Sequence, residues 1–260
     1  MHRLSQYAIL LFIIAVLVFP STTSSRVASQ TKKNTAYAVV IDNTASLRKN
    51  LPQVRMLGQA VAKQLHQRGP ILLIDFKLNL NSTFFGLYDA NDAAEGRNSE
   101  RASGVVKVDF TENEDTLNKH LETLTLARGN TDLFGAIQLA AEELNAKINA
   151  GQGVLENKVL ILITDGEHRI EMLGSSDAED DERKARQGKL VKTLKASGIK
   201  VFAIGLLEDL NAHSGRYRTT TRERAESFLK TITKQTGGQV VLATRKKFDP
   251  DQIVAQLSIE

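Results

Sequence analysis

Short apolar runs alternate with helical patterns along most of this 260-residue chain, and this alternation limits the possible folds more than any other feature. The clearest runs are Tyr37–Ile41 (YAVVI), Pro70–Phe76 (PILLIDF), Lys158–Thr164 (KVLILIT), Lys200–Leu206 (KVFAIGL) and Gln239–Ala243 (QVVLA). They have the length of strands and lack polar alternation, which is typical of strands buried on both faces. The runs therefore predict a sheet that is covered by helices on both sides.

The segments between these runs carry apolar residues at helical spacing. The first of them places five on one face, with Pro52 in the first turn, where proline is tolerated: Leu51, Val54, Leu57, Val61 and Leu65. Further helices are expected near 114–124, 132–149, 183–196, 223–236 and 249–257. Strands that alternate with helices predict parallel strands joined by right-handed crossovers. We expect a three-layer, doubly wound α/β fold with a mostly parallel six-stranded sheet.

One edge of this sheet is expected to be antiparallel. Ser82–Leu87 (STFFGL) follows the second strand after a short polar link and is the candidate for that edge strand, while Val105–Phe110 is a candidate for another short strand. Tyr88–Gly104, rich in Asn, Asp, Ser and Gly, is expected to form a surface loop. No long change of composition interrupts the pattern, so we expect one domain over residues 36–260.

The first 25 residues have the organisation of a secretory signal peptide. A positively charged start precedes an apolar run of 12 residues, Ala8–Phe19, and the small polar stretch Pro20–Ser25 follows it. A membrane-spanning helix needs about 20 apolar residues, so cleavage and export are expected, with an uncleaved N-terminal anchor as the alternative. Residues 26–35 are expected to be a polar leader. The sequence does not distinguish periplasm, cell surface and medium, and no membrane contact is expected beyond this segment.

Composition excludes several classes of function. The formal charge of +4 is a small excess spread along the chain, and aromatic residues make up 5% of it, so neither a basic patch nor a base-stacking platform predicts nucleic-acid binding. The chain has no cysteine. Disulfide scaffolds, thiolate metal sites and cysteine nucleophiles are therefore excluded.

Polar residues with oxygen ligands follow the predicted strands where they end. Asp42–Ser46 (DNTAS) follows the first strand, Asp165 follows the most apolar strand, and Thr131 precedes a helix for which Asp132 is a suitable N-cap. In doubly wound sheets, ligands bind outside the carboxyl ends of the strands. We therefore expect two carboxylates and three hydroxyls at one edge of the sheet: Asp42, Thr44, Ser46, Thr131 and Asp165.

Hard oxygen ligands of this kind suit Mg²⁺, Mn²⁺ or Ca²⁺, whereas zinc and copper favour nitrogen and sulfur. We expect one divalent cation, with Mg²⁺ as the first choice and Mn²⁺ or Ca²⁺ as alternatives. Five protein oxygens leave at least one coordination position open. A cation held mainly by neutral hydroxyls keeps most of its charge, so it should attract a carboxylate from outside the chain.

These residues resemble the metal-ion-dependent adhesion site (MIDAS) of von Willebrand factor type A and integrin inserted domains. That signature combines Asp-x-Ser-x-Ser after the first strand, a distant Thr, and an Asp that ends the fourth strand. Asp42, Ser46, Thr131 and Asp165 match it, while Thr44 replaces the first Ser and adds a methyl group. The resemblance covers roughly Ala36 to Leu257, and the chain also looks like an exported bacterial group labelled VWFA-related in Acidobacteria.

The resemblance implies a role for each residue. Thr44 and Ser46 would bind the cation directly through their hydroxyls, and Thr131 would bind it directly or through water. Asp42 and Asp165 would mostly hold metal-bound waters and neighbouring hydroxyls. An Asp or Glu of a partner protein would complete the coordination shell. The predicted function is therefore metal-dependent protein binding of the adhesion type.

Other interpretations stay open. Each residue of the site can serve merely as a turn or cap residue, and Thr44 is the feature that favours a structural domain with a vestigial metal site. A metal-dependent hydrolase is a further alternative, but an aspartyl-phosphate phosphatase needs a second Asp where Thr44 stands. Phosphate-binding, Gly-x-Ser-x-Gly and His-Glu-x-x-His motifs are also missing from the sequence, so no enzyme is expected. The basic segment Arg216–Arg224 is a candidate for part of a partner surface.

Overall fold

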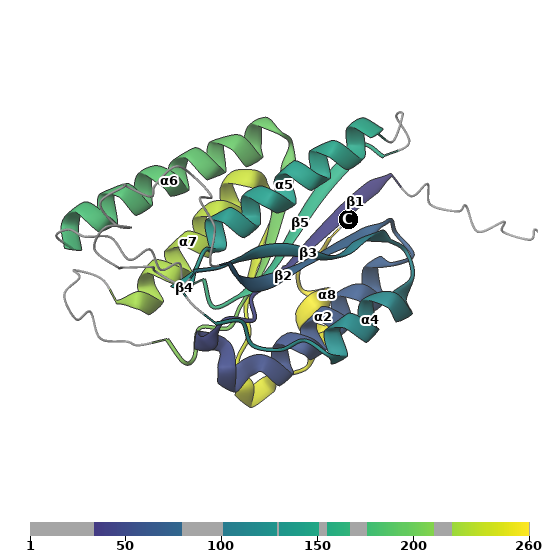
Figure 1. Cartoon of the computed structure of the whole chain (residues 1–260), viewed down its shortest axis with the longest axis horizontal. Coiled ribbons are helices and arrows are strands. Elements are labelled where there is room, and N and C mark those ends of the chain that lie inside the picture. Colours follow the sequence, from purple (N-terminus) through teal and green to yellow (C-terminus); the bar gives the residue numbers. More distant parts are fainter. Residues whose placement is uncertain are drawn as a thin grey trace, which may run out of the picture. The chain divides into compact units, whose positions relative to one another are not determined.

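A mixed sheet forms the centre of the computed structural model (Figure 1). The structure describes residues 34–79, 101–128, 130–150, 155–166, 176–210 and 220–259. Their strands follow the spatial order β4-β3-β2-β1-β5-β6-β7. The bounds are β1 Thr35–Ile41, β2 Ile71–Asn79, β3 Arg101–Thr111, β4 Asn130–Thr131, β5 Asn157–Thr164, β6 Ile199–Gly205 and β7 Val240–Leu242.

Parallel pairing dominates this sheet, as the sequence predicts. β1 lies between β2 and β5 and is parallel to both, with Ala38 opposite Leu72 on one side and Leu160 on the other. β5, β6 and β7 continue the parallel series. All seven residues of β1 are buried. The expectation of strands buried on both faces is therefore confirmed for the central strand.

The antiparallel strand lies elsewhere in the sequence than expected. β3 pairs antiparallel with β2, and Thr111 lies opposite Ile71 and Arg101 opposite Asn79. Ser82–Leu87, the expected edge strand, lies outside the described residues. β3 is also longer than the expected Val105–Phe110, since it begins inside the segment that was expected to be a loop. Its small residues Ala102, Ser103 and Gly104 do not show a strand pattern by themselves, and pairing with β2 overrides their weak propensity.

Six of these strands form the mixed sheet that the sequence predicts, and the two-residue β4 is an addition. β4 is parallel to β3 and places Thr131 opposite Ala102. Two residues are too few to show a periodicity. The sequence pattern therefore does not predict this strand.

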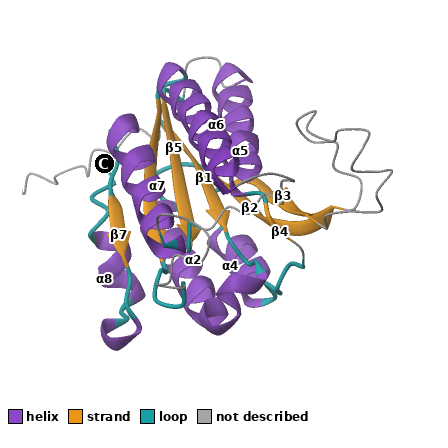
Figure 2. Cartoon of the chain, turned by 90° about the vertical axis from the view of Figure 1, so that its left-hand side faces the viewer, coloured by secondary structure: helices purple, strands orange, loops and turns teal. Residues whose placement is uncertain are grey.

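Helices cover both faces of the sheet and complete three layers (Figures 1 and 2). One layer contains α5 (Leu133–Ala150), α6 (Ser176–Ala196) and α7 (Thr221–Thr236). The other contains α2 (Leu51–Leu65), α4 (Glu114–Glu122) and α8 (Pro250–Ala255). Short 3₁₀ helices, η1 (Ala45–Asn50) and η2 (Arg245–Lys247), precede α2 and α8. The predicted α/β class and its three layers are confirmed.

Two hydrophobic cores lie on opposite faces of the sheet because neighbouring side chains of a strand point in opposite directions. On β2, Leu72 and Ile74 belong to the core beneath α5, α6 and α7. Leu73 on the same strand belongs to the core beneath α2, α4 and α8. On α2, Val54, Leu57, Val61 and Leu65, four of the five residues expected on the apolar face, are buried, and Leu51 is partly buried.

The helices begin and end at recognisable signals. Thr220 and Glu223 form a capping box at the start of α7, and Gly237 ends that helix at a φ of 80°. The pKa of Glu223 is lowered because its carboxylate accepts hydrogen bonds from Thr220. α6 begins at Ser176, seven residues earlier than expected.

In the described part of the chain, no helix is long and apolar enough to cross a membrane. The expected signal peptide, residues 1–25, lies outside this part. Most of the expected polar leader, residues 26–33, lies outside it too. The prediction of export therefore depends on the sequence pattern of these residues.

Candidate metal centre

Asp42 is the centre of a hydrogen-bond network at the carboxyl end of β1. Its side chain is fully buried. Oδ1 accepts hydrogen bonds from the Thr44 amide at 3.0 Å and from the Thr44 hydroxyl at 2.6 Å. Oδ2 accepts a bond of 2.7 Å from the hydroxyl of Thr164, the last residue of β5. Three donors from two strand ends therefore fix this carboxylate.

Three hydroxyls continue the network away from Asp42. Thr44 Oγ1 lies 3.3 Å from Ser46 Oγ, and Thr131 Oγ1 donates to Thr44 Oγ1 at 3.1 Å. Thr44 and Thr131 are buried, whereas Ser46 is partly exposed. The structure thus brings together four of the five predicted residues, and Ser46 lies nearest to the surface.

Asp165, the fifth predicted residue, follows Thr164 directly and is buried. β1 and β5 lie side by side up to Ile41 and Ile163, and the Asp42 amide donates to the Ile163 carbonyl at 2.9 Å. Asp165 therefore leaves the sheet beside the Asp42 loop. Gly166 follows at a φ of 72°, where a side chain would be strained and would meet Ala225 of α7. This glycine allows the chain to turn closely beneath α7.

Asn43 is a residue of this region that sequence reasoning missed. Its side chain pairs with the backbone of Phe76 in β2: Phe76 N donates to Oδ1 at 2.9 Å, and Nδ2 donates to the Phe76 carbonyl at 3.3 Å. Nδ2 also donates to the Thr125 carbonyl at 2.6 Å, and the Asn43 carbonyl accepts from Ala127 N at 2.8 Å. One buried amide thus connects the Asp42 loop, β2 and the segment that leads to Thr131.

That segment has a second anchor on α2. Arg55 donates from Nε to the Leu124 carbonyl at 3.2 Å, and its Nη2 contacts the same oxygen. Leu124 and Ala127 are buried. The polypeptide before Thr131 is therefore held by Asn43, by Arg55 and by its own apolar side chains.

Asp132 has the capping role that the sequence predicts. Its Oδ1 accepts a hydrogen bond of 3.1 Å from Gly135 N in the first turn of α5. A Cβ on Gly135 would lie 2.4 Å from the other carboxylate oxygen, so the close cap requires glycine there. Because Asp132 caps the helix, Thr131 is placed two residues before the start of α5, at the edge of the sheet.

Comparison with known families decides the class of this chain. A family model for the von Willebrand factor type A (VWA) domain matches residues 37–243. This chain belongs to the VWA family. The match runs from β1 to the residue after β7 and so includes every residue of the candidate centre.

A solved structure supports the fold of this VWA domain. The pilus adhesin SpaC from Lactobacillus rhamnosus GG superposes with a TM-score of 0.55 at 18% sequence identity. The match covers 86% of this chain and 29% of the adhesin chain. No curated protein sequence matches this chain. At this identity the likeness shows the fold alone, and the resemblance to the exported bacterial VWFA-related group stays a prediction.

The oxygen atoms of the candidate centre fit a hard divalent cation. Among the described residues, no group of three or more His, Cys, Asp and Glu could hold a metal, so a nitrogen- or sulfur-rich site has no counterpart in this part of the chain. The Thr44 hydroxyl gives its proton to Asp42, which leaves an oxygen lone pair for another contact. The donors are carboxylate and hydroxyl oxygens, which Mg²⁺ and Ca²⁺ prefer.

Replacing Asn43 tests whether its side-chain amide holds the candidate centre in place. In Asn43→Ala the buried backbone groups of Phe76 lose their partner, so the free energy of unfolding should fall by about 1–3 kcal/mol. Amide hydrogen exchange at Phe76 and Ala127 should accelerate more than exchange elsewhere in the sheet.

Thr236→Val is the matched control. The Thr236 hydroxyl accepts a bond of 3.1 Å from Val201 N at the beginning of β6, at the opposite edge of the sheet. This variant should accelerate exchange at Val201 and leave Phe76 and Ala127 unchanged. Equal acceleration at Phe76 in both variants would show that Asn43 has no local role.

Proposed function

We propose that this VWA domain is an exported, adhesion-type module that binds a partner protein through one divalent cation. The cation is held by Asp42, Thr44, Ser46, Thr131 and Asp165, with Mg²⁺ as the first choice and Mn²⁺ or Ca²⁺ as alternatives. The partner presents an Asp or Glu. The observation that carries this proposal is the chain of hydrogen bonds from Asp42 through Thr44 to Thr131.

The physical argument begins with the sequence distance that this network spans. Thr44 and Thr131 are 87 residues apart, yet their hydroxyls are in hydrogen-bond contact in a buried position. Each of these hydroxyls has a hydrogen-bond partner, and a hydroxyl oxygen has two lone pairs, so it can also contact a cation. A cation satisfies several hydroxyl oxygens together, and Asp42 supplies negative charge next to them. The partly exposed Ser46 marks the side from which a partner carboxylate would approach.

Binding fits this arrangement better than catalysis. VWA domains are typically interaction modules, and the solved structure with a similar fold is described as a pilus adhesin. A hydrolase would need a nucleophile beside an acid or base of tuned pKa. The structural alternative, a vestigial metal site, depends on the methyl group of Thr44. That alternative predicts that divalent cations do not change the stability of the domain.

Metal titration separates these alternatives. Mg²⁺ or Mn²⁺ at a hundredfold excess over Kd should stabilise the protein by about 2.7 kcal/mol, because it binds the native state. The measurement is thermal unfolding with increasing metal. Asp42→Ala should remove the shift, and Thr44→Val, which keeps the side-chain volume and removes the hydroxyl, should reduce it in a folded protein. A parent protein that shows no shift would refute the metal proposal.

The carboxylate requirement has its own test. Mn²⁺ bound at the centre should relax the NMR signal of water, and a peptide carboxylate that replaces a bound water should weaken this effect. Gly-Glu-Gly with an acetylated N-terminus and an amidated C-terminus should do so in a concentration-dependent way. The isosteric Gly-Gln-Gly, blocked in the same way, should have little effect because it has no carboxylate. An identical response to both peptides would contradict carboxylate recognition.

Export is tested at the N-terminus. The full chain produced in a bacterial host should be cleaved after Ser24 or Ser25, because Ala8–Phe19 has the pattern of a signal peptide. The measurement is the mass and N-terminal sequence of the protein that leaves the cytoplasm. An intact chain recovered from the membrane fraction would support the anchor alternative.

A further inference from the structure

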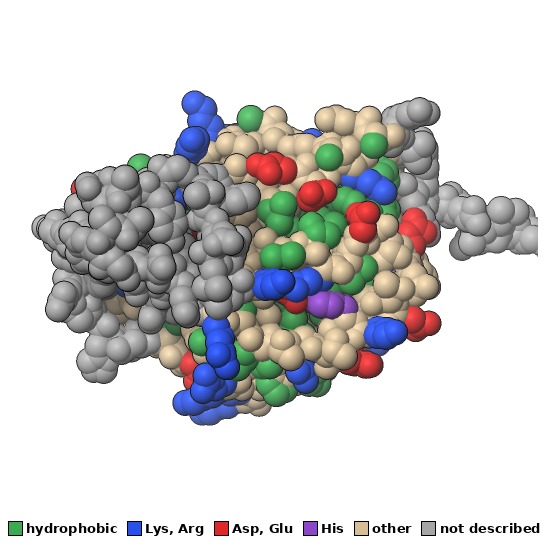
Figure 3. All heavy atoms as spheres, viewed as in Figure 1, with side chains coloured by type: hydrophobic (Ala, Val, Ile, Leu, Met, Phe, Trp, Pro, Cys, Tyr) green, Lys and Arg blue, Asp and Glu red, His purple; other side chains and the backbone are tan. Residues whose placement is uncertain are grey.

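Five basic residues gather at the carboxyl edge of the sheet, beside the candidate centre. We call Arg48, Lys49, Arg245, Lys246 and Lys247 the basic patch; all five are exposed. Arg48 and Lys49 belong to η1, which follows β1, and the other three form η2, which follows β7. Figure 3 shows Lys and Arg side chains gathered at the lower left, over η1 and the start of α2 as drawn in Figure 1.

Tertiary contacts bring the two halves of the patch together. Arg245 donates from Nε and Nη2 to Asn50 Oδ1, the last residue of η1, at 2.9 and 2.8 Å. Arg245 also forms an ion pair with Asp209, and Asn50 donates to the same carboxylate at 3.0 Å. This contact spans 195 residues of sequence. The patch is therefore a fixed feature of the folded domain.

Positive charge exceeds negative charge in this patch. Two acidic residues contact it, Asp209 through the ion pair and Glu208 through a hydrogen bond from the Arg245 amide at 3.0 Å. Both contacts involve Arg245. Within the described part of the chain, the other four basic residues have no ion pair. Such an excess of exposed charge attracts a partner of opposite charge and speeds its association.

We call the side-chain hydroxyls of Thr44, Ser46 and Thr131 the hydroxyl cluster. The patch adjoins this cluster through η1. Side chains three residues apart eclipse one another in a 3₁₀ helix, so Lys49 lies on the same face of η1 as Ser46. Ser46 Oγ is 3.3 Å from Thr44 Oγ1. A chain that places a carboxylate at the centre would therefore extend towards Lys49.

A hollow of about 310 Å³ lies on the other side of the patch. It is lined by Leu207, Glu208, Arg222, Leu242, Ala243 and Thr244, so its one acidic side chain balances its one basic side chain. Leu242 is one of two large apolar side chains that are clearly exposed in the described structure. The residue after Thr244 is Arg245, so the hollow continues the patch. It offers a place for a partner side chain beside a basic surface.

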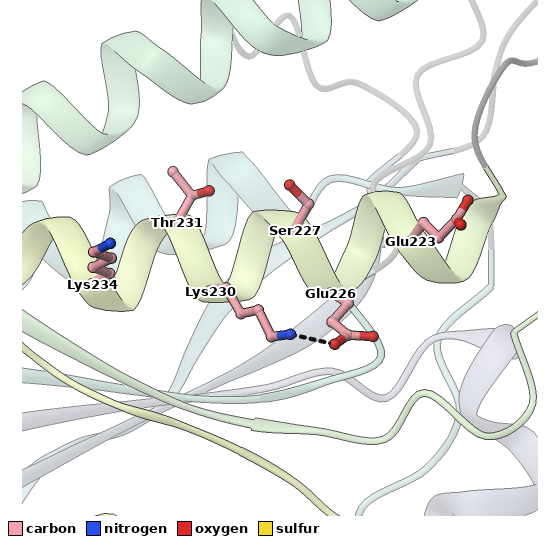
Figure 4. Close-up of a pocket in the computed structure, with 6 residues that line it drawn as sticks. All are labelled: Glu223, Glu226, Ser227, Lys230, Thr231 and Lys234. Carbon is pink, nitrogen blue, oxygen red and sulfur yellow. Dashed lines mark hydrogen bonds and ion pairs between the residues drawn. The ribbon is translucent and has the colours of Figure 1, made fainter.

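A second hollow lies along α7 (Figure 4). It has a volume of about 430 Å³ and is lined by Glu223, Glu226, Ser227, Lys230, Thr231 and Lys234. Two acidic residues balance two basic ones, and Lys230 forms an ion pair with Glu226. This hollow has no charge excess that would select an acidic partner.

We infer that the basic patch is a docking surface for an acidic polypeptide segment, and that the same segment supplies the carboxylate to the cation; the second half rests on the proposed function. The patch has no aromatic side chain on which a nucleic-acid base could stack. The neighbouring hollow and exposed Leu242 suit a polypeptide, which alternates charged and apolar side chains. The patch steers and orients the segment, and the metal fixes one carboxylate.

Binding of poly-L-glutamate to the full chain tests this inference. Affinity is measured by calorimetry at two salt concentrations, with Mg²⁺ and with chelator. The double variant Lys246→Glu/Lys247→Glu should lower the affinity about tenfold at low salt and less at high salt, because exposed charges are screened. Circular dichroism confirms that each variant is folded.

Lys192→Glu/Lys195→Glu is the matched control. Both lysines are exposed near the end of α6, which leads into the beginning of β6 at the opposite edge of the sheet. The control makes the same change in net charge and should bind poly-L-glutamate like the parent. An equal loss in the control would mean that only net charge matters, and the inference would be wrong.

The arms of the experiment separate this inference from the proposed function. Binding that is lost in the patch variant and is unchanged by chelator would support the docking surface. It would contradict the proposal that the segment binds through the cation. Binding that requires metal and is unchanged in the patch variant would support binding through the cation and contradict the docking surface. Patch-dependent binding of phosphatidylserine vesicles or of an oligothymidylate, without binding of poly-L-glutamate, would overturn the inference in favour of a membrane or a nucleic acid.

Discussion

The buried carboxylate of Asp42 is the interaction on which the arrangement of the candidate centre depends. An unpartnered charge in this position would cost several kcal/mol. Two donors from Thr44 and one from Thr164 offset that cost. The Thr44 donors belong to the same loop as Asp42, whereas the Thr164 donor reaches Asp42 Oδ2 only when the parallel strands β1 and β5 are paired in register. Pairing of these two strands therefore completes the hydrogen bonding of the carboxylate.

The hydroxyl cluster has a different physical character from a carboxylate-rich metal site. Thr44, Ser46 and Thr131 are neutral, so a cation that they bind keeps much of its charge and stays attractive to a carboxylate from outside. The cost is weaker binding of the cation by the protein alone. Rigid placement compensates for this, because Asn43, Arg55 and the Asp132 cap hold the segments on either side before any ligand arrives.

The sequence predicted those parts of the fold that local patterns encode. Apolar runs located β1, β2, β5, β6 and β7, and their ends located Asp42 and Asp165. β4 and the full length of β3 were missed, since pairing with neighbours sets them and their own residues do not. Asn43 was overlooked for the same reason: its four bonds join segments 33 to 84 residues away. The position of Thr164 could have been recognised from the sequence, because it places a hydroxyl at the end of the most apolar strand.

The basic patch shows why surface chemistry is harder to predict than a core. In sequence, Arg48 and Lys49 are an ordinary pair and Arg245–Lys247 a short run near the end of the chain. Only the doubly wound topology, which sends the ends of β1 and β7 to the same edge, makes them one surface. The same topology delivers the hydroxyl cluster to that edge. If the proposed metal binding holds, long-range charge attraction would determine how often a partner arrives and short-range metal coordination how long it stays.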